Sequence, residues 1–466
     1  MKKVCSPYFD PEFETLIERI HGPSCRVCID NERCEQCTVV KVDCDNKHGL
    51  LLDVVQVLTD MDLVICKSYV CSDAGWFMDV FHVRDESGNK IRDERLINYI
   101  KQAISPKELR NTTEVRSCSG KIASSETSSE HTAIEMTGTD RPGLFSEISA
   151  VLTDLRCNVV EAHAWSHNAR LACIVHVSDE STAGPIDDPS RLATIKDHLS
   201  TVLRADTAPD DQIGRVKTAY PGDDSTVSHQ ERRLHQLMLA GQDFHGPVQS
   251  VTPVSPERAA CDDEGRKTIV SIDRCNEKGY SVVHIECKDR PKLIFDTVCA
   301  LTDLQFVVFH ASTIRHDSFT TQEYYIRHVN GCTLETETEM QLVAKCLEAA
   351  IERRVCEGVR LELCAHDRVG LLSDVTRLLR EYGLTVARAD IETQGEEVIN
   401  VFYVRDISGN AVDMEIVDSM KREMEPLALQ VKSESLLRRS NSPERPRFSF
   451  GNMLRSQIER FSQNFI

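Results

Sequence analysis

One short phrase occurs four times along the chain, and this repetition constrains the fold more than any other feature of the sequence. At one fixed distance after each copy stands a leucine, at Leu58, Leu152, Leu301 or Leu379. Four matches at a single spacing indicate that the chain is built from four copies of one structural unit. The copies read Asn46-Lys47-His48-Gly49-Leu50, Asp140-Arg141-Pro142-Gly143-Leu144, Asp289-Arg290-Pro291-Lys292-Leu293 and Asp367-Arg368-Val369-Gly370-Leu371.

The apolar residues around each copy change their period from two to 3.6. In the first unit, an alternating run with Val40 and Val42 precedes the phrase, and apolar residues then recur at Leu51, Val54 and Leu58. These periods are typical of a strand followed by an amphipathic helix. Two β-rich runs and a second amphipathic segment follow in every unit. The second helices are predicted near residues 93–104, 190–204, 336–354 and 413–425.

This order predicts an α+β fold of four tandem ferredoxin-like units (βαββαβ), in which two helices cover one face of a four-stranded antiparallel sheet. A stretch containing Pro and Gly separates the second and third units and is interpreted as a linker with a short helix over residues 229–239. The predicted segments are 26–117, 131–220, 267–356 and 359–432 for the four units, the first and third with a leading strand, 205–266 for the linker, which overlaps the end of the second unit, and 433–466 for a basic amphipathic tail.

The leading strand of the first and third units indicates a longer period of half the chain. The same offset separates Asp30 from Asp273 and Gly49 from Lys292. The shared block is therefore a leading strand followed by two units. We expect each half of the chain to form one interlocked body that contains two units.

The third unit has no closing strand of its own, because residues 359–364 must form the first strand of the fourth unit. An unpaired sheet edge invites association with other chains. We therefore expect residues 267–273 to pair as a hairpin with residues 280–287, and residues 26–30 to fill the same place in the first unit. The second and fourth units are expected to use C-terminal strands near residues 215–220 and 427–432.

The Asp-Arg-Pro-Gly-Leu phrase at a strand-to-helix turn resembles the ACT domain, a small regulatory module that often binds amino acids. Four copies in tandem, the changed phrases of the first and third units, and the run Gly75-Trp76-Phe77-Met78-Asp79-Val80-Phe81 are similar to the plant ACT domain repeat (ACR) family. The resemblance covers most of residues 26–432. It implies a non-catalytic regulatory protein that binds free amino acids and whose ACT units pair within or between chains.

The turn suits an amino acid on chemical grounds. The first N–H groups of a helix are unpaired and favour a carboxylate, glycine lets a ligand approach and permits positive φ, and the aspartate accepts a hydrogen bond from an ammonium group. Ordinary helix capping without a ligand uses the same residues, and both interpretations stay open. The candidate ligand-binding residues are Asn46, Gly49, Asp140, Arg141, Gly143, Leu144, Asp289, Arg290, Asp367, Arg368, Gly370 and Leu371.

The four turns are not expected to bind a ligand alike. Asn46 lacks the negative charge that the first turn would need, and Lys292 replaces the glycine of the third turn. We expect Asp140→Ala and Asp367→Ala to weaken ligand binding while the fold stays intact.

Composition and motif content exclude several function classes. A formal net charge of −19 disfavours nucleic acid and anionic membranes as partners. The sequence has no phosphate-binding glycine loop, nucleophile elbow or His-Glu-x-x-His motif, and the four units occupy nearly its whole length. We therefore expect no enzyme activity and no cofactor. Because no run approaches the ~18 apolar residues of a membrane span and no signal peptide is evident, the expected location is the cytoplasm or nucleus.

The nineteen cysteines are odd in number and often lie in apolar runs, which favours reduced, buried thiols over a disulfide framework. Cys25, Cys28, Cys34 and Cys37 are spaced like paired zinc ligands, but the equivalent segment of the third unit lacks them. No metal is therefore expected, and a reactive dithiol is the weaker alternative. Four histidines on predicted strands are interpreted as half-buried strand residues: His163, His176, His284 and His310.

Two hypotheses for the function follow. The first is an amino-acid sensor, and the alternative is an interaction scaffold that assembles through ACT sheets without a small ligand. The expected partners are a free amino acid and, through the sheets, a second copy or another protein. In the tail, Phe450, Leu454 and Ile458 recur at helical spacing. A helix docked on the chain's own sheets is the plain interpretation, and a segment for a partner or a membrane surface is the alternative.

Overall fold

The computed structural model divides the chain into two compact units, which are described separately below. The first comprises residues 1–121, 255–351 and 443–466, and the second residues 122–254 and 352–442. Within these ranges the structure describes residues 25–45, 49–73, 76–104, 131–204, 215–219, 229–245, 268–275, 278–316, 318–355, 358–395, 397–408, 412–424 and 430–435.

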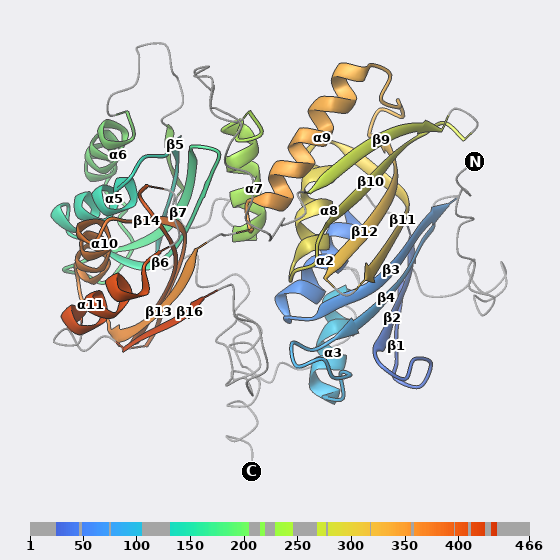
Figure 1. Cartoon of the computed structure of the whole chain (residues 1–466), viewed down its shortest axis with the longest axis horizontal. Coiled ribbons are helices and arrows are strands. Elements are labelled where there is room, and N and C mark those ends of the chain that lie inside the picture. The colour runs from blue at the N-terminus through green and yellow to red at the C-terminus, as the bar shows by residue number, and fades with distance from the viewer. Residues whose placement is uncertain are drawn as a thin grey trace. The chain divides into compact units, whose positions relative to one another are not determined.

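In the first unit, eight strands form one antiparallel sheet in the order β1-β2-β4-β3-β11-β12-β10-β9 (Figure 1). In the described residues of this unit, four helices accompany these strands. The strands are β1 (Cys25–Asp30), β2 (Thr38–Asp45), β3 (Val64–Asp73), β4 (Trp76–Arg84), β9 (Ile269–Cys275), β10 (Tyr280–Lys288), β11 (Phe306–His316) and β12 (Phe319–His328), and the helices are α2 (Leu50–Asp60), α3 (Glu94–Ile104), α8 (Leu293–Asp303) and α9 (Glu337–Glu352).

The second unit has the same architecture, with a sheet in the order β16-β13-β15-β14-β6-β7-β5-β8. One additional helix, α7, belongs to it. The strands are β5 (Thr132–Thr139), β6 (Cys157–His167), β7 (Arg170–Asp179), β8 (Arg215–Ala219), β13 (Val359–His366), β14 (Leu384–Gln394), β15 (Glu397–Asp406) and β16 (Gln430–Ser435), and the helices are α5 (Leu144–Asp154), α6 (Pro189–Leu203), α7 (Gln230–Ala240), α10 (Leu371–Glu381) and α11 (Met414–Met424).

The prediction that each half of the chain forms one body is wrong, because each unit combines one repeat from either half. The first repeat joins the third through antiparallel pairing of β3 with β11, and the second joins the fourth through β6 and β14. In each case, the strand that a single repeat would leave at an open edge becomes the centre of a continuous sheet. Sequence similarity between repeats does not reveal this choice, because all four offer the same kind of edge.

The predicted closing strands are confirmed. Strand β9 pairs with β10 and β1 pairs with β2, so the edge in the first unit comes from a strand that precedes the repeat. In the second unit, β8 pairs with β5 and β16 pairs with β13, so the edge comes from a strand that follows the repeat. The same position is thus filled from opposite ends of the repeat in the two units.

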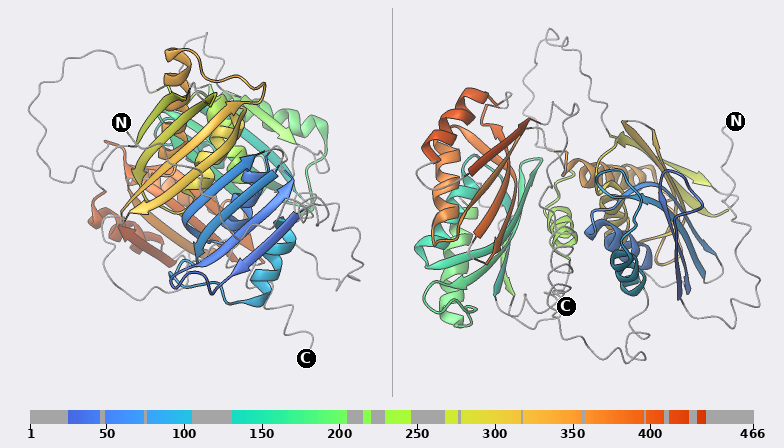
Figure 2. Two further views of the ribbon diagram at one scale, coloured as in Figure 1. Left: turned by 90° about the vertical axis from the view of Figure 1, so that its right-hand side faces the viewer. Right: turned by 90° about the horizontal axis from the view of Figure 1, so that it is seen from below.

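The core of each unit lies between its sheet and the helices on one face of that sheet, which confirms the predicted α+β class (Figure 2). Alternation along β5 buries every second residue, and Leu144, Ile148 and Leu152 of α5 face the same core. Each such side chain contributes roughly 1.5–3 kcal/mol by burial.

Helix α7 confirms the linker helix that was predicted over residues 229–239. It lies on the opposite face of the second unit's sheet from the other helices (Figure 2). There Leu234 and Met238 pack against Trp165, which is 1% exposed. The second sheet is therefore covered on both faces over part of its area.

The expectation that the cysteines are all reduced is wrong for one pair. Cys25 of β1 and Cys44 of β2 form a disulfide. They are direct partners in the antiparallel register of these strands, and that register cannot be read from cysteine spacing. The predicted tail lies outside the described residues beyond Ser435, as does Asn46.

Candidate functional site: the strand-to-helix turns

The four turns share one backbone conformation just before the helix begins. The residue there is left-handed, with φ of 86° at Gly49, 82° at Gly143, 63° at Lys292 and 80° at Gly370. Glycine adopts this conformation at little cost, whereas a residue with a Cβ loses about 1 to 2 kcal/mol. The positive φ proposed for the glycines is confirmed, and Lys292 carries the strain in the third repeat.

The arginine that follows the aspartate in three of the turns is held in an ion pair. Its partner is an acidic residue in the first turn of the helix that follows. The guanidinium groups of Arg141 and Arg290 also donate to carbonyl oxygens of the repeat's second helix, at Val202 and Ile351 respectively. In the second and third repeats, the arginine therefore connects the turn to both helices. The pairs are Arg141 with Glu147, Arg290 with Asp296 at 2.7 Å, and Arg368 with Asp374 at 2.5 Å.

The three aspartates of the turns have different surroundings. Ser166 donates to the carboxylate of Asp140, and burial raises the pKa of that group. Asp289 accepts a hydrogen bond from Thr320 at 2.7 Å and pairs with Arg315 at 2.6 Å. Within the described part of the chain, the carboxylate of Asp367 has no such partner. Asp367 is therefore the aspartate best able to receive an ammonium group.

A cavity of about 20 Å³ lies beside Asp367 and is completed by the second repeat. The fourth repeat contributes Asp367, Arg368, Gly370 and Leu371 to its lining. Across the junction, the second repeat contributes the start of β6 and two polar side chains of α5. These residues are Ser149, Thr153, Cys157, Asn158 and Val159.

The turn of the second repeat lines a smaller cavity of about 10 Å³, in which the roles of the two repeats are exchanged. Thr376 and Arg380 of α10 complete it. At the junction of the helices, the hydroxyls of Ser149 and Thr376 lie 2.7 Å apart, and these residues are 227 positions apart in the chain. The two cavities are thus related by an approximate two-fold axis between the second and fourth repeats.

One residue makes the two cavities unequal. A Cβ on Gly143 would lie 2.8 Å from Cδ of Arg380, whereas a Cβ on Gly370 would lie 3.3 Å from Cγ2 of Thr153. Arg380 and Thr153 occupy corresponding places, so a long side chain crosses one turn and a short one faces the other. The turn at Gly370 is the more accessible of the two.

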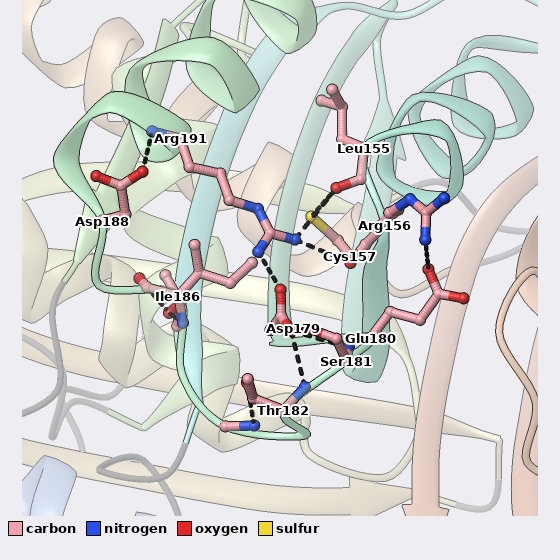
Figure 3. A network of polar contacts seen from close by, with 12 residues as sticks. Leu155, Arg156, Cys157, Asp179, Glu180, Ser181, Thr182, Ile186, Asp188 and Arg191 are labelled. Carbon is pink, nitrogen blue, oxygen red and sulfur yellow. Dashed lines mark hydrogen bonds and ion pairs between the residues drawn. The ribbon is translucent and has the colours of Figure 1, made fainter.

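An arginine of α6 binds the segment that directly precedes β6 (Figure 3), and the start of β6 lines the larger cavity. Arg191 pairs with Asp179 at the end of β7 and donates to the carbonyl oxygens of Leu155 and Arg156 at 3.3 and 3.1 Å. This contact fixes the chain directly before Cys157, where β6 begins to line the cavity. The part of β6 that lines the cavity is therefore connected to both α6 and β7 through Arg191.

Sequence reasoning found the turns but missed the residues opposite them. Ser149, Thr153, Thr376 and Arg380 were not among the candidates, because they reach the turns only through the pairing of the second repeat with the fourth. Short polar residues on otherwise apolar helix faces, at 149, 153 and 376, were the available signal. Leu144, the first residue of α5, lines the smaller cavity, and Leu371, the first residue of α10, lines the larger one. Gly49 directly precedes α2, and a Cβ at this position would have no described atom within 4 Å.

The four histidines lie on strands, but His163 has more partners than a half-buried strand residue needs. Its ring nitrogens lie 2.9 Å from Asp390 and 3.2 Å from Glu161. Burial alone would lower the pKa of His163, but the two carboxylates raise it to about 10. Burial alone would raise the pKa of Glu161, but the contact with His163 lowers it to about 2. His163 and Asp390 are also 227 positions apart, so the cluster lies at the junction of the two repeats.

The N-terminal cysteines are arranged as pairs. Cys25 is bonded to Cys44, and the sulfur atoms of Cys34 and Cys37 lie 2.7 Å apart. Burial raises the pKa of Cys37 to about 12, while the hydrogen bond from Cys37 lowers that of Cys34. Among the described residues, no group of three or more His, Cys, Asp or Glu side chains is arranged to hold a metal ion.

Comparison with known proteins connects this geometry to a family. Residues 33–111 match the ACR family N-terminal ACT domain, and residues 130–186 and 359–420 match the ACT domain. ACT domain-containing protein ACR2 of Arabidopsis thaliana is 55% identical, with 100% of this chain and 99% of that protein covered. The chain belongs to the ACT domain repeat family. ACR3 from the same organism is 50% identical, with 91% and 90% covered.

The ACT domain repeat relatives named above are described as ACT domain-containing proteins, without a catalytic domain in their names. A solved aspartate kinase from Synechocystis matches 66% of this chain and 43% of that one, at 10% identity and a TM-score of 0.17, which is too low for any inference. In this ACT domain repeat protein, none of the described helices has the length and apolar character needed to cross a membrane.

Proposed function

We propose that this ACT domain repeat protein is a non-catalytic regulatory protein that binds a free amino acid at the Asp367 turn. The observation that carries this proposal is the combination of a carboxylate at Asp367 that has no partner among the described residues, the N-terminus of α10 and a cavity beside both. A carboxylate is favoured at the helix N-terminus, and Asp367 would accept from an ammonium group.

Ligand binding at this place would act on the pairing of repeats. The cavity draws residues from the second and fourth repeats, so a ligand that fills it contacts both. A ligand that binds only the paired state stabilises that state by mass action. The regulatory output would then be a change in how firmly these two repeats hold together, and so in the surface that the second unit offers to a partner protein.

The experiment is a thermal-shift panel with the twenty amino acids on the full chain, followed by calorimetric titration of those that raise the melting temperature. Under the proposal, one or a few amino acids at millimolar concentration raise it, because at 100 times Kd the stabilisation reaches about 2.7 kcal/mol. A flat panel would instead favour the scaffold alternative, in which ACT sheets serve assembly alone.

A further inference from the structure

One position in the sheet carries a polar side chain in three of the four repeats, although it faces the helices and the core. It lies on the third strand of each repeat, where the residue pairs with a buried residue of the first strand. The four residues, with their partners, are Asp79 with Val42, Cys173 with Met136, Gln322 with Ile285, and Asn400 with Leu363.

These polar groups are buried without adequate hydrogen bonding. Asp79, Gln322 and Asn400 are each at most 1% exposed. The amide of Gln322 accepts from Tyr324 through its oxygen, and within the described residues its nitrogen faces no better acceptor than the sulfur of Cys287. Both side-chain atoms of Asn400 lack a hydrogen bond to any residue of the described chain. An unsatisfied buried polar group costs about 1–3 kcal/mol, so an apolar residue, such as Cys173 of the second repeat, would suit the fold better.

Asn400 differs from the others because it lines the cavity beside Asp367. The lining of that cavity combines the turn and the N-terminus of α10 with apolar side chains at Leu371, Ile391 and Val398. Asn400 therefore supplies an unpaired donor and an unpaired acceptor at a place that a group held by the turn could reach.

Resting on the function proposed above, we infer that Asn400 determines the specificity of the Asp367 site, and that the ligand is an amino acid whose short side chain ends in a neutral hydrogen-bonding group, a hydroxyl or a carboxamide. The carboxamide of Asn400 offers one donor and one acceptor to such a group. An aliphatic side chain leaves both of these unpaired, and an ionised one is buried without a counter-charge.

The size of the cavity supports a short side chain. A volume of about 20 Å³ holds a group the size of a water molecule. The carboxylate and ammonium of the ligand would remain at the turn, and only the tip of the side chain would enter. In the second repeat, the sheet position that corresponds to Asn400 is Cys173, which does not line the smaller cavity, and Arg380 lies across the turn at Gly143, so that cavity lacks this means of selection.

The test is calorimetric titration of the full chain with three pairs of ligands that differ in the neutral hydrogen-bonding group of the side chain: L-threonine and L-valine, L-serine and L-alanine, and L-asparagine and L-aspartate. We expect the hydroxyl or carboxamide member of at least one pair to bind at least tenfold more tightly, since sites built to hydrogen-bond a group reject analogues that lack it. In Asn400→Cys, which introduces the residue of the second repeat, that ratio falls to within threefold of unity. In Asn400→Ser, the hydroxyl or carboxamide member of the pair should still bind more tightly, because the serine hydroxyl keeps a donor and an acceptor.

The matched control is Gln322→Cys, which removes a carboxamide from the equivalent position of the first unit and should leave the ratio unchanged. A wild-type protein that binds both members of every pair equally would overturn the inference, as would an Asn400→Cys ratio equal to that of the wild type, and either result leaves amino-acid binding itself intact. If the wild-type chain binds none of the twenty amino acids, both the inference and the proposed function are wrong.

Discussion

The two units share the order of strands in the sheet and the left-handed turns, and each joins two repeats in the same way. The side chains that surround the turns differ between the units. In the first unit, the Asp289 carboxylate pairs with Arg315, and Lys292 occupies the glycine position in a left-handed conformation. In the second unit, Gly370 keeps its place and Asp367 stays unpaired in the described chain. The comparison teaches that the phrase shared by all repeats preserves a fold, whereas what surrounds each aspartate decides whether it is available to a ligand.

A second difference concerns the sheet faces. In the second unit, α7 covers Trp165, and a row of charged groups lies near the junction of β6 and β14. Arg388 pairs with Asp390 there, and Asp390 in turn contacts His163. The first unit has aromatic side chains on β10, β11 and β12 instead, where Arg327 stacks on Tyr280. Among the described residues, the second unit thus has a cluster of charge pairs at the junction of its repeats.

The largest effect is expected from breaking that charge pairing. His163→Ala leaves Glu161 and Asp390 without their shared partner and should lower the free energy of unfolding of the second unit by about 3 kcal/mol. In a Trp76→Phe background, Trp165 is the remaining tryptophan and reports this unit in denaturant titrations. The control is His284→Ala in the first unit, where the histidine is 37% exposed; measured by hydrogen exchange of β10, the loss should stay below about 1 kcal/mol. Equal losses in both variants would contradict the comparison.

The same cluster predicts a dependence on pH. The pKa of His163 is raised to about 10 from an ordinary 6.5, so its contribution is complete below 6.5 and is lost as the pH rises to 10. The pKa of Glu161 is lowered to about 2 from 4.5, so its contribution is complete above 4.5 and is lost as the pH falls toward 2. Stability of the second unit should therefore be greatest between about pH 4.5 and 6.5. His163→Gln should remove the decline on the alkaline side.

The next effect concerns ligand binding. Asp367→Asn removes the charge that would receive the ammonium group and should weaken amino-acid binding by about 10- to 100-fold, the value of a hydrogen bond to a charged group. Asp289→Asn should leave the affinity unchanged, because Arg315 and Thr320 already occupy that carboxylate. Calorimetric titration measures both. Asp140→Ala should weaken amino-acid binding less than Asp367→Ala does, because Ser166 already donates a hydrogen bond to the carboxylate of Asp140.

A pair of glycine substitutions distinguishes the cost of a left-handed conformation from an effect on ligand binding. Gly49→Ala and Gly370→Ala both place a Cβ at positive φ, so each should cost about 1 to 2 kcal/mol of stability. Gly370→Ala also directs its Cβ toward Thr153 across the cavity, whereas Gly49 faces open space. Chemical denaturation should therefore find a similar loss in the free energy of unfolding for both variants. Calorimetric titration should find weaker ligand binding in Gly370→Ala and unchanged binding in Gly49→Ala.

The smallest effect is expected at Asp79 of the first unit. Burial raises the pKa of this carboxyl well above its ordinary value, so the folded state binds a proton that the unfolded state releases above about pH 4. Asp79→Asn, which introduces the residue found in the fourth repeat, should stabilise the first unit by about 1 kcal/mol at pH 7. The gain should grow with pH and vanish below pH 4. Hydrogen exchange of β4 measures it within the full chain.

Much of the fold could be predicted because its signals are local. The change of apolar period at each phrase gave the strands and helices, and the shortage of chain between α9 and β13 required an external strand at the edge of the third repeat, which β9 supplies. The apolar spacing at Leu234, Leu237 and Met238 likewise gave α7. Of the candidate site, the turn glycines and their conformation were accessible in the same way.

The other half of the site could not be predicted, since it depends on which repeats meet. Ser149 and Thr376 touch although 227 positions separate them, and the same separation joins His163 to Asp390. The disulfide of Cys25 and Cys44 depends on strand register in the same manner. Spacing within one repeat contains no information about these contacts.

The sequence by itself determined the number of repeats, the order of their elements and the left-handed turn before each first helix, because periodicity and turn chemistry act over a few neighbouring residues. Tertiary structure alone decided that the first repeat pairs with the third and the second with the fourth, and so which side chains face each turn. The physical reason is that all four repeats present similar open edges. The choice among them therefore rests on the sum of side-chain contacts across each junction, which no single stretch of the sequence contains.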